Sequence, residues 1–495
     1  RDVLGSRGLG DVYKRQKLVS FLPSERAQSV MAEGGINAAL NTKDENDSPE
    51  EHFTDTIKAA CGLADPNAVW GMTQAAPELV HWLLKLGVKF NMSGHDDVDL
   101  RNFGGQKKKR TAFAQSDTGK QIMTAMIDAV RRKEASGMVE RFSHHSFLTL
   151  RLCDNICCGC VIRDEYSQET VELPGDAVIV ATGGMHGLFG NTTGSLSNTG
   201  EVTAELFRLG VPLANGEMIQ YHPTTVKCGG KRMLISEAAR GEGGRLFAMK
   251  DGKQWYFMEE KYPELGNLMP RDITAREIWK VSHESEVFLD MTEISEEIIS
   301  NKLSGLADDC MTYLHKDIRK EPVSVLPGIH YFMGGILVDE QHRTPIQNLC
   351  AAGECCAQYH GANRLGGNSL LGALYGGRVA AKSACEQADV VDLSCATQID
   401  FPPASQISEI KQLNKVMQET MGVVRNENTL LNGIQTVQAL TGNLPLLGMA
   451  VLKSALARKE SRGAHWREDY PKSNDDDYLK TTVARFDGKQ IQLSL

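Results

Sequence analysis

The stretch DAVIVATGG, residues 176–184, is the feature that most restricts how this chain can fold. It is a continuous apolar run that ends in two glycines, which is typical of a buried parallel strand leading into a tight turn. The stretch TPIQNLCAAGE, residues 344–354, repeats the pattern. The segment GGNSLLGALYGGRVAAKSAC, residues 366–385, predicts a helix whose N-terminus faces an anion or a polar ring edge. Together these segments predict an α/β fold with a nucleotide-binding sheet.

The chain of 495 residues is long enough for about two to four domains. The charged region of residues 224–328 lies between the two predicted strands and predicts an α+β domain inserted into the sheet domain. Residues 404–460 carry amphipathic helical patterns. The predicted organisation is a sheet domain in two parts, residues 17–223 and 329–390, with the insertion between them and a helical C-terminal domain and tail over residues 400–495.

The stretch RAQSVMAEGGINAAL, residues 26–40, predicts a loop whose backbone lies close to another group. Polar residues lead into Gly34 and Gly35, and glycine allows tight turns and close approach. The polar residues before them can donate hydrogen bonds. An ordinary loop at the start of a helix is the alternative, and this stretch alone does not separate the two.

Residues 1–16, RDVLGSRGLGDVYKRQ, are rich in glycine but do not predict a dinucleotide-binding loop. Gly5, Gly8 and Gly10 do not give the spacing G-x-G-x-x-G, and no apolar strand precedes them. The part DVYKRQ back-translates readily to a transposase adapter end used in sequencing libraries. We therefore expect residues 1–16 to be a non-native leader, with native sequence beginning near Lys17 and the first part of the sheet domain missing.

The formal net charge of −9 disfavours wholesale nucleic-acid binding. The obvious basic run extends from Lys107 to Arg110, and most runs of this kind lie on the solvated surface. No uninterrupted apolar stretch reaches the roughly 18 residues that a membrane-spanning helix needs.

Four of the twelve cysteines are close together in the stretch LRLCDNICCGCVIRD. Such a cluster suggests metal binding, but its flanks predict two strands around a turn at Cys153-Asp154-Asn155, and no second cluster has zinc or iron–sulfur spacing. We therefore expect no metal site, and reduced cysteines in a sheet: Cys153, Cys157, Cys158 and Cys160. A reducing cytoplasm is the simplest compartment.

Several residues suited to chemistry stand in glycine-rich surroundings: His222, Ser236, Glu237, Arg240, Arg271, His330, His360 and Arg364. Each has an ordinary structural explanation, since a histidine beside proline is often a turn residue and an acid three residues before an arginine is often a helix pair. Together these residues suggest a binding site for an anionic ligand. Arginine is always charged and binds carboxylates through two hydrogen bonds. A small dicarboxylate needs a cationic clamp at each end, and these residues converging on a flavin would supply both.

Ordered motifs extend from about residue 20 to about residue 480: AEGGINAAL, HFTDT, RNFGG, RTAFAQSDTG, VATGG, QYHPT, EAARGEGG, PRD, HYFMGGI, AAGE, GANRLGGNSLL and SRGAHWREDYP. In these motifs the chain resembles the flavoprotein subunits of fumarate reductase and succinate dehydrogenase, and their relative L-aspartate oxidase. The resemblance implies a Rossmann-like FAD-binding domain, incomplete at its N-terminus, interrupted by a capping domain and followed by a helical domain.

The resemblance also implies catalytic roles. Arg271 would donate a proton to the substrate carbon, opposite hydride delivery from the flavin N5. Free arginine is a poor acid, so Glu237 and Arg240 would form a relay that returns the proton to it. Fixed Arg and His groups would stabilise the negative charge of the transition state.

The two substrate carboxylates would be bound by two pairs of residues. His222 and Ser236 would bind one carboxylate, and His330 and Arg364 the other. The family usually has threonine where Ser236 stands, and both residues carry a hydroxyl.

The resemblance implies FAD as cofactor, bound without a covalent bond. Many membrane-bound relatives carry the flavin on the histidine of a Ser-His-Thr triplet, which aligns here with Ala27-Gln28-Ser29, and glutamine cannot form that link. The family has Asp in a Thr-Gly-Asp-Gly motif where Glu201 stands, which makes that contact less certain. The residues expected at the cofactor are Gln28, Ser29, Glu33, Gly34, Gly35, Glu201, Glu354, Ser369 and Leu370.

In this family, loss of the covalent link lowers the reduction potential of the flavin and disfavours succinate oxidation. The resemblance therefore favours fumarate reduction as the activity of this chain. Glu33 also matches the quinol:fumarate reductase type. L-aspartate oxidase is the alternative, but it typically has a glutamate for the substrate amino group where Phe103 stands here. Succinate dehydrogenase, adenylylsulfate reductase and a non-catalytic flavoprotein subunit also remain open.

The chain has no haem motif and no iron–sulfur cysteine set, so its electrons must come from elsewhere. The resemblance implies an iron–sulfur subunit, with a membrane anchor subunit or a soluble donor beyond it. It implies a cytoplasmic protein, peripheral on the inner face of the membrane where partner subunits hold it there.

Overall fold

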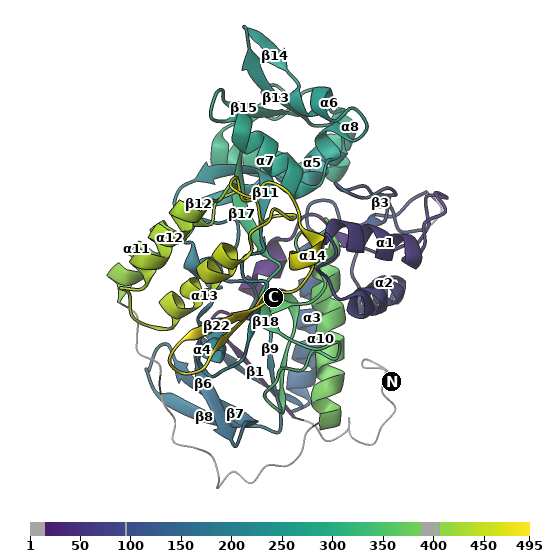
Figure 1. Ribbon diagram of the computed structural model, residues 1–495. Coiled ribbons are helices and arrows are strands. Elements are labelled where there is room, and N and C mark those ends of the chain that lie inside the picture. The colour runs from purple at the N-terminus through teal and green to yellow at the C-terminus, as the bar shows by residue number, and fades with distance from the viewer. Residues whose placement is uncertain (1–14, 95–96, 388–400, 402–405) are drawn as a thin grey trace.

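The computed structural model describes residues 15–94, 97–387, 401 and 406–495 (Figure 1). The predicted leader therefore lies outside the described residues up to position 14, and β1 (Gln16–Ser20) is the first strand. It pairs in parallel with β5 (Val139–Ser143), which follows the long helix α3 (Thr118–Ala135).

The two apolar runs ending in glycine form neighbouring parallel strands, as predicted. β9 (Val178–Val180) pairs with β19 (Leu349–Ala351), although the paired Val178 and Leu349 are 171 positions apart in sequence. Helix α10 (Asn368–Gln387) packs against both strands, and it is the helix predicted over residues 366–385. The predicted α/β class is confirmed.

The cysteine-rich stretch forms the predicted hairpin. Strands β6 (His145–Cys153) and β7 (Ile156–Asp164) meet at a turn in which Asp154 and Asn155 have φ of 46° and 66°, and β8 (Thr170–Pro174) extends the sheet. Cys157, Cys158 and Cys160 are free thiols. Cys153 is disulfide-bonded, so the expected reduced state is wrong for this residue, which lies at the turn end of β6. No group of three metal-ligating side chains occurs among the described residues.

The inserted region stands apart at the top of Figure 1 and contains both helices and an antiparallel sheet. It is entered and left through β11 (Ile219–Cys228) and β17 (Leu326–Phe332), which pair antiparallel, with β12 (Lys231–Leu234) beside β11. Its own sheet has the order β14-β13-β15-β16, formed by Lys253–Trp255, Arg245–Lys250, Val287–Asp290 and Val323–Ser324.

Helices of the inserted region pack on this sheet around a separate apolar core that includes Leu246, Ile278 and Leu289. They are α5 (Glu237–Gly241), α6 (Phe257–Lys261), α7 (Arg271–Val281), α8 (Glu296–Lys302) and α9 (Ser304–Asp309). The predicted limits at residues 224 and 328 fall inside β11 and β17, so these two strands connect the insertion to the rest of the chain.

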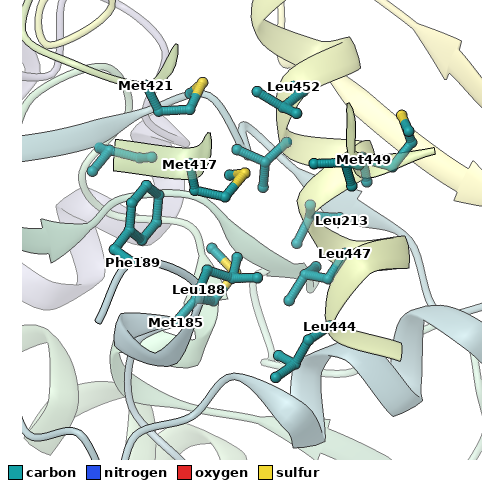
Figure 2. Close-up of a cluster of buried hydrophobic side chains, with 14 of the residues drawn as sticks. Met185, Leu188, Phe189, Leu213, Met417, Met421, Leu444, Leu447, Met449 and Leu452 are labelled. Atoms are coloured by element: carbon teal, nitrogen blue, oxygen red, sulfur yellow. The ribbon is translucent and has the colours of Figure 1, made fainter. Parts of the chain in front are cut away.

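The C-terminal region begins with three helices, α11 (Ile407–Thr420), α12 (Glu427–Val437) and α13 (Asn443–Ala457). Figure 2 shows Met417, Met421, Leu447 and Leu452 of this region packed against side chains such as Phe189, which anchors the helices on the sheet domain. The predicted tail after these helices contains two strands, β21 (Val483–Phe486) and β22 (Ile491–Ser494). They join a sheet of order β20-β18-β10-β21-β22, whose other strands are Cys356–Ala357, Gly335–Leu337 and Leu213–Ala214.

The remaining elements complete the sheet domain, the inserted region and the C-terminal region. They are η1 (Ser24–Arg26), η2 (Gln28–Met31), β2 (Ile36–Asn37), α1 (Pro49–Ala59), α2 (Pro66–Leu86), β3 (Leu100–Arg101), β4 (Thr111–Ala112), η3 (His186–Leu188), α4 (Glu201–Arg208), β10 (Leu213–Ala214), η4 (Gly266–Leu268), η5 (Cys310–Leu314), β18 (Gly335–Leu337), η6 (Gly353–Cys355), β20 (Cys356–Ala357) and α14 (Asp475–Tyr478). None of the helices in the described part of the chain is long and apolar enough to cross a membrane.

The basic run from Lys107 to Arg110 is not a solvated surface patch throughout. Arg110 is completely buried, and its Nη2 lies 2.9 Å from Oδ1 of Asp47 and 2.9 Å from Oδ2 of Asp55. The surface expectation is therefore wrong for Arg110, because two buried carboxylates pair with its charge.

Candidate active site

Three charged side chains from two short helices form one buried group. Oε2 of Glu237 accepts hydrogen bonds from Nε and Nη2 of Arg271, at 2.9 and 2.6 Å. The other carboxylate oxygen, Oε1, accepts from Nη2 of Arg240 at 3.2 Å. All three residues are buried. The carboxylate therefore lies between the two guanidinium groups, in the arrangement that the expected proton relay requires.

The helix starts position these side chains. Glu237 is the first residue of α5, where Oγ of the N-cap residue Ser236 accepts from the backbone N–H of Ala238 at 3.4 Å. Arg271 is the first residue of α7, and Pro270 before it has a φ of −48°, within the range that its ring allows. Because the backbone is fixed at both helix starts, Glu237 and Arg271 meet in one defined geometry.

Opposing effects act on the charge of Glu237. Burial raises the pKa of this carboxyl, but the charges of Arg271 and Arg240 outweigh burial, so the pKa is lowered. Burial also lowers the pKa of Arg240, whose Nη1 donates to the carbonyl oxygen of Asn267 at 2.6 Å. Glu237 is therefore held ionised between two cations.

The expected carboxylate-binding residues lie around this group and keep free hydrogen-bonding capacity. The rings of His222 and His330 meet edge to face, with centroids 5.1 Å apart. Nε2 of His222 and Nε of Arg364 are buried and have no hydrogen-bond partner among the described residues. Buried polar atoms are nearly always paired, so these two atoms are suited to bind a polar ligand.

Arg364 is a buried cation that forms no ion pair with a carboxylate among the residues that the structure describes, although the charges of Glu354 and Glu237 act on it from farther away. Its guanidinium carbon lies over the ring of Tyr331, 4.3 Å from the ring centroid. Burial, and then the charge of Arg271, lower the pKa of Arg364 to about 9. A bound anion would offset both effects, so this position favours a negatively charged ligand.

The two histidines are neutral. Burial, followed by the charge of Arg271, lowers the pKa of His222 and of His330 well below the ordinary value. Nδ1 of His222 lies 3.3 Å from the backbone nitrogen of Thr224, and Nδ1 of His330 lies 2.8 Å from Oγ1 of Thr193. Each ring thus has one nitrogen engaged by the protein, and its other nitrogen can face a ligand.

Ser236 and Glu33 were expected at two different sites but lie together. The hydroxyl of Ser236 caps α5 and lies near the carboxyl of Glu33, whose pKa burial raises to about 8. Oε2 of Glu33 is buried and has no hydrogen-bond partner in the described chain. The N-terminus of α5 therefore lies beside the loop that carries Glu33.

Hydrogen bonds from other parts of the protein fix the backbone of the loop of residues 28–35. Gln28 and Ser29 are in η2, and the backbone N–H of Gly119, at the start of α3, donates to the carbonyl of Ala32 at 2.7 Å. Nη2 of Arg101 donates to the carbonyls of Glu33 and Gly34, at 3.1 and 2.6 Å. These bonds fix the backbone path into the two glycines, as close approach to a ligand requires.

Glycine is required beside the expected cofactor-binding residues. Gly35 has a φ of +133°, and a Cβ there would lie 2.5 Å from the carbonyl oxygen of Ala112. Gly367 has a φ of +82°, and a Cβ there would lie 2.1 Å from Oδ1 of Asn37. Ser369 and Leu370 follow in the first turn of α10. The free backbone N–H groups of a helix start suit an anion or a polar ring edge.

The two other acidic candidates differ in their surroundings. Glu354, in η6, accepts a hydrogen bond at Oε1 from the backbone N–H of Phe332 at 3.0 Å, and burial raises its pKa to about 7. Glu201 is exposed in the first turn of α4, and the charged residues that act on it are Arg163 and Glu165. Glu201 therefore does not join the buried group around Glu237.

Uncharged partners of the site escaped the sequence analysis. Oε1 of Gln220 accepts from Nη1 of Arg271 at 3.0 Å, and its Nε2 donates to Oδ1 of Asn363 at 2.9 Å. Both residues stand inside quoted motifs, QYHPT and GANRLGG, next to residues chosen for their charge. Their position inside these motifs is the sequence feature by which they could have been identified.

The model of the family described as FAD binding domain matches residues 14–370, and the model described as Fumarate reductase flavoprotein C-term matches residues 441–495. The chain belongs to the succinate dehydrogenase and fumarate reductase flavoprotein family. The recognition made from the motifs is confirmed, and the protein is an FAD-dependent oxidoreductase of this family.

Relatives named as succinate dehydrogenase subunits and relatives named as fumarate reductase subunits are both similar to the chain. The succinate dehydrogenase flavoprotein subunit of Bacillus subtilis is 38% identical, over 95% of this chain and 89% of the relative. The 8-methylmenaquinol:fumarate reductase flavoprotein subunit of Wolinella succinogenes is 31% identical, over 95% of this chain and 84% of the relative. A solved structure of an E. coli quinol fumarate reductase variant matches with a TM-score of 0.87 at 27% identity, covering 97% of this chain and 91% of that one.

The residues present fit FAD. The fixed glycine turn at Gly34-Gly35, the tight turn before α10 and the buried carboxyl of Glu354 provide backbone donors and a polar group of the kind that a flavin nucleotide needs.

Proposed function

We propose that this flavoprotein reduces fumarate to succinate. The observation that carries the proposal is the group of Arg271, Arg364, His222 and His330 around one buried carboxylate, Glu237. Two cations and two neutral imidazoles converge there, and part of their hydrogen-bonding capacity is unused. A dianion with a carboxylate at each end matches this donor set.

The protein residues position the substrate and move the proton. The chemistry that FAD would supply, once reduced, is a hydride for one alkene carbon of fumarate. Arg271 donates a proton to the other carbon, and Glu237, whose Oε2 contacts Nε and Nη2 of Arg271, returns a proton from Arg240. General acids of this kind contribute about 10²- to 10⁴-fold to the rate.

The two ends of the substrate are assigned to opposite sides of Arg271. His222, with Ser236, binds one carboxylate, and Nε2 of His222 is the donor when Nδ1 accepts from Thr224. Arg364, with His330, binds the other. The fixed positive charge at both ends stabilises the carbanion-like transition state.

Gln28 supports the reductive direction. It stands in η2 at the position where relatives with covalent flavin have histidine, and its amide cannot form that bond. A flavin held without the bond has a lower potential in this family, which favours fumarate reduction over succinate oxidation. Glu33 in the same loop matches the quinol:fumarate reductase type, which also agrees with fumarate reduction.

Phe103 argues against L-aspartate as the substrate. Its ring lies 3.1 Å from where a Cβ of Gly34 would be, and also 3.1 Å from where a Cβ of Gly366 would be. The position that carries a glutamate in L-aspartate oxidase is therefore filled by an apolar ring between two glycine turns. Such a ring cannot pair with an ammonium group as a carboxylate does.

We further propose an iron–sulfur subunit as the electron donor, held at the cytoplasmic face of the inner membrane by an anchor subunit. Both similar relatives are named flavoprotein subunits, which supports an assembly with other chains. A soluble donor is the alternative.

The test is made on the FAD-loaded protein, purified without air. Fumarate reduction is measured with reduced viologen, and succinate and L-aspartate oxidation are measured on the same preparation. A sample is then precipitated with acid to see whether the yellow flavin stays in solution. Fumarate reduction as the fastest activity, with all flavin released, is the expected result. Oxidation of L-aspartate alone would refute the substrate assignment, and flavin in the pellet would refute the role of Gln28.

A further inference from the structure

Arg271 is held on two sides, and only one of them is the expected relay. Glu237 contacts its Nε and Nη2. On the other side, Nη1 donates to Oε1 of Gln220 at 3.0 Å. Arg271 therefore uses all three of its nitrogens on protein acceptors, and Gln220 fixes the third.

A chain of hydrogen bonds continues outward from Gln220. Its Nε2 donates to Oδ1 of Asn363 at 2.9 Å, and Nδ2 of Asn363 donates to Oδ1 of Asp272 at 3.0 Å. Gln220 and Asn363 are buried. The chain thus connects Arg271 to the residue that follows it in sequence, by a path that crosses two other parts of the molecule.

The groups at the two ends of this series of hydrogen bonds determine which atom of each amide donates and which accepts. A guanidinium group can only donate hydrogen bonds, and an ionised carboxylate can only accept them. If either amide were flipped, its NH₂ group would face another donor or its oxygen would face another acceptor. Nε2 of Gln220 also donates to the carbonyl oxygen of Arg364 at 2.8 Å. This carbonyl and, through Asn363, the carboxylate of Asp272 therefore both favour the orientation in which Gln220 presents oxygen to Arg271.

We propose that Asp272 is a positioning residue for the proton donor, acting on Arg271 through Asn363 and Gln220. Asp272 also lies in the first turn of α7, where backbone N–H groups and Arg276 interact with its carboxylate. A role confined to the start of the helix is the competing explanation. The inference rests on the proposed function, because it concerns the alignment of the acid in that reaction.

Double-mutant analysis separates the two explanations. The variants are Asp272→Ala, Asn363→Ala and the double variant, with fumarate reduction expressed per bound flavin. Each single variant is expected to lower kcat about tenfold with KM within about twofold, because small misplacement of a reacting group is costly. The double variant is expected to match the single variants, since either change breaks the same chain.

Two further variants complete the design. Asp272→Asn keeps an acceptor oxygen and is expected to retain kcat within about threefold of the unmodified protein, because Asn363 can still donate to it. Glu296→Ala is the matched control. It removes a first-turn carboxylate from α8, which pairs with Arg319, and it is expected to leave kcat unchanged. The melting temperature is recorded for every variant.

Some outcomes would overturn the proposal. An unchanged kcat per flavin in Asp272→Ala, with only a lower melting temperature, would restrict Asp272 to a helix-capping role. Effects of Asp272→Ala and Asn363→Ala that multiply in the double variant would mean that the two residues act separately. Failure of the unmodified protein to reduce fumarate would instead refute the proposed function, and this result is distinguishable from the other two.

Discussion

Two groups of buried arginines in this molecule serve different ends. In the C-terminal motif SRGAHWREDYP and just before it, Arg458, Arg462 and Arg467 are each paired with carboxylates. In the candidate active site, Arg364 has no carboxylate partner among the described residues, and its Nε is unpaired. Both groups are buried, so burial alone does not distinguish them.

The C-terminal group is saturated with protein acceptors. Nε of Arg458 lies 2.7 Å from Oε1 of Glu217, and its other nitrogens bond Glu460, Thr482 and the carbonyls of Tyr478 and Lys480. These bonds connect the last part of the chain to the sheet domain. A buried charge that is fully paired inside the protein has no capacity left for a ligand.

The comparison distinguishes Arg364 by its lack of protein acceptors in the described part of the chain. Arg101 and Arg425 are also buried, with one unpaired nitrogen and a lowered pKa, but each donates several hydrogen bonds to carbonyl oxygens or a ring nitrogen. Nε of Arg364 has no partner among the described residues, and burial lowers its pKa to about 9. We therefore propose Arg364 as the substrate clamp, and Arg271, paired with one carboxylate and one amide, as the proton donor.

Arg458→Met is expected to have the largest effect on stability. It leaves Glu217 and Glu460 as buried carboxylates without their partner, which costs about 3–5 kcal/mol. Fumarate reduction per bound flavin should be unchanged in the protein that remains folded. Thermal or denaturant unfolding measures the loss. The control is Arg485→Met, an exposed arginine of β21, for which a change of less than about 0.5 kcal/mol is expected. Equal effects of the two variants would contradict a structural role for the C-terminal group.

Arg364→Ala is expected to act on binding rather than on folding. Removing the clamp leaves one substrate carboxylate unpaired, which costs roughly 2–5 kcal/mol, or about 30- to 4,000-fold in Kd. Titration of the bound flavin's absorbance with fumarate measures this Kd. Arg364→Lys restores a positive charge and should recover part of the affinity. An unchanged Kd in Arg364→Ala would remove Arg364 from the substrate site.

The substitution Glu33→Gln tests how the charge of Glu33, which lies just before Gly34 and Gly35, affects the stability of the fold. Its expected effect is smaller than that of the two arginine substitutions. Burial raises the pKa of Glu33 from about 4.5 to about 8, so the folded state binds more protons than the unfolded state within this window. The stability contributed by Glu33 is therefore present at pH 4 and is lost as the pH rises towards 8. Glutamine does not titrate. We expect the variant to melt about 1–2 °C above the unmodified protein at pH 8.5 and not at pH 5. A constant difference across this range would contradict the shifted pKa.

The fold was predictable where apolar pattern and glycine coincide. Residues 176–184 and 344–354 carry that pattern, and their strands pair in the structure. The ion pair of Glu237 and Arg240 was also predictable, because the two residues are three positions apart on one helix. The closing strands β21 and β22 were missed, since a short hairpin that completes a distant sheet has little pattern of its own.

The rest of the site depends on contacts that no local pattern contains. Gln220 and Asn363 are 143 residues apart in sequence, yet they are hydrogen-bonded. The burial of Arg110 depends in the same way on Asp47, 63 residues away. Glu201 stays a prediction from its motif alone, since its exposed side chain in the first turn of α4 makes no contact with described residues that ties it to the buried group around Glu237.

The most direct test of the account compares one arginine from each group under the same conditions. Fumarate reduction per bound flavin is measured for Arg271→Lys and Arg458→Lys. Lysine keeps the charge but cannot reproduce the planar pairing with Glu237 and Gln220. The account predicts a loss of about 10²- to 10⁴-fold in Arg271→Lys, with fumarate still bound, and an unchanged rate in folded Arg458→Lys. Full activity in Arg271→Lys would contradict the assignment of Arg271 as the proton donor.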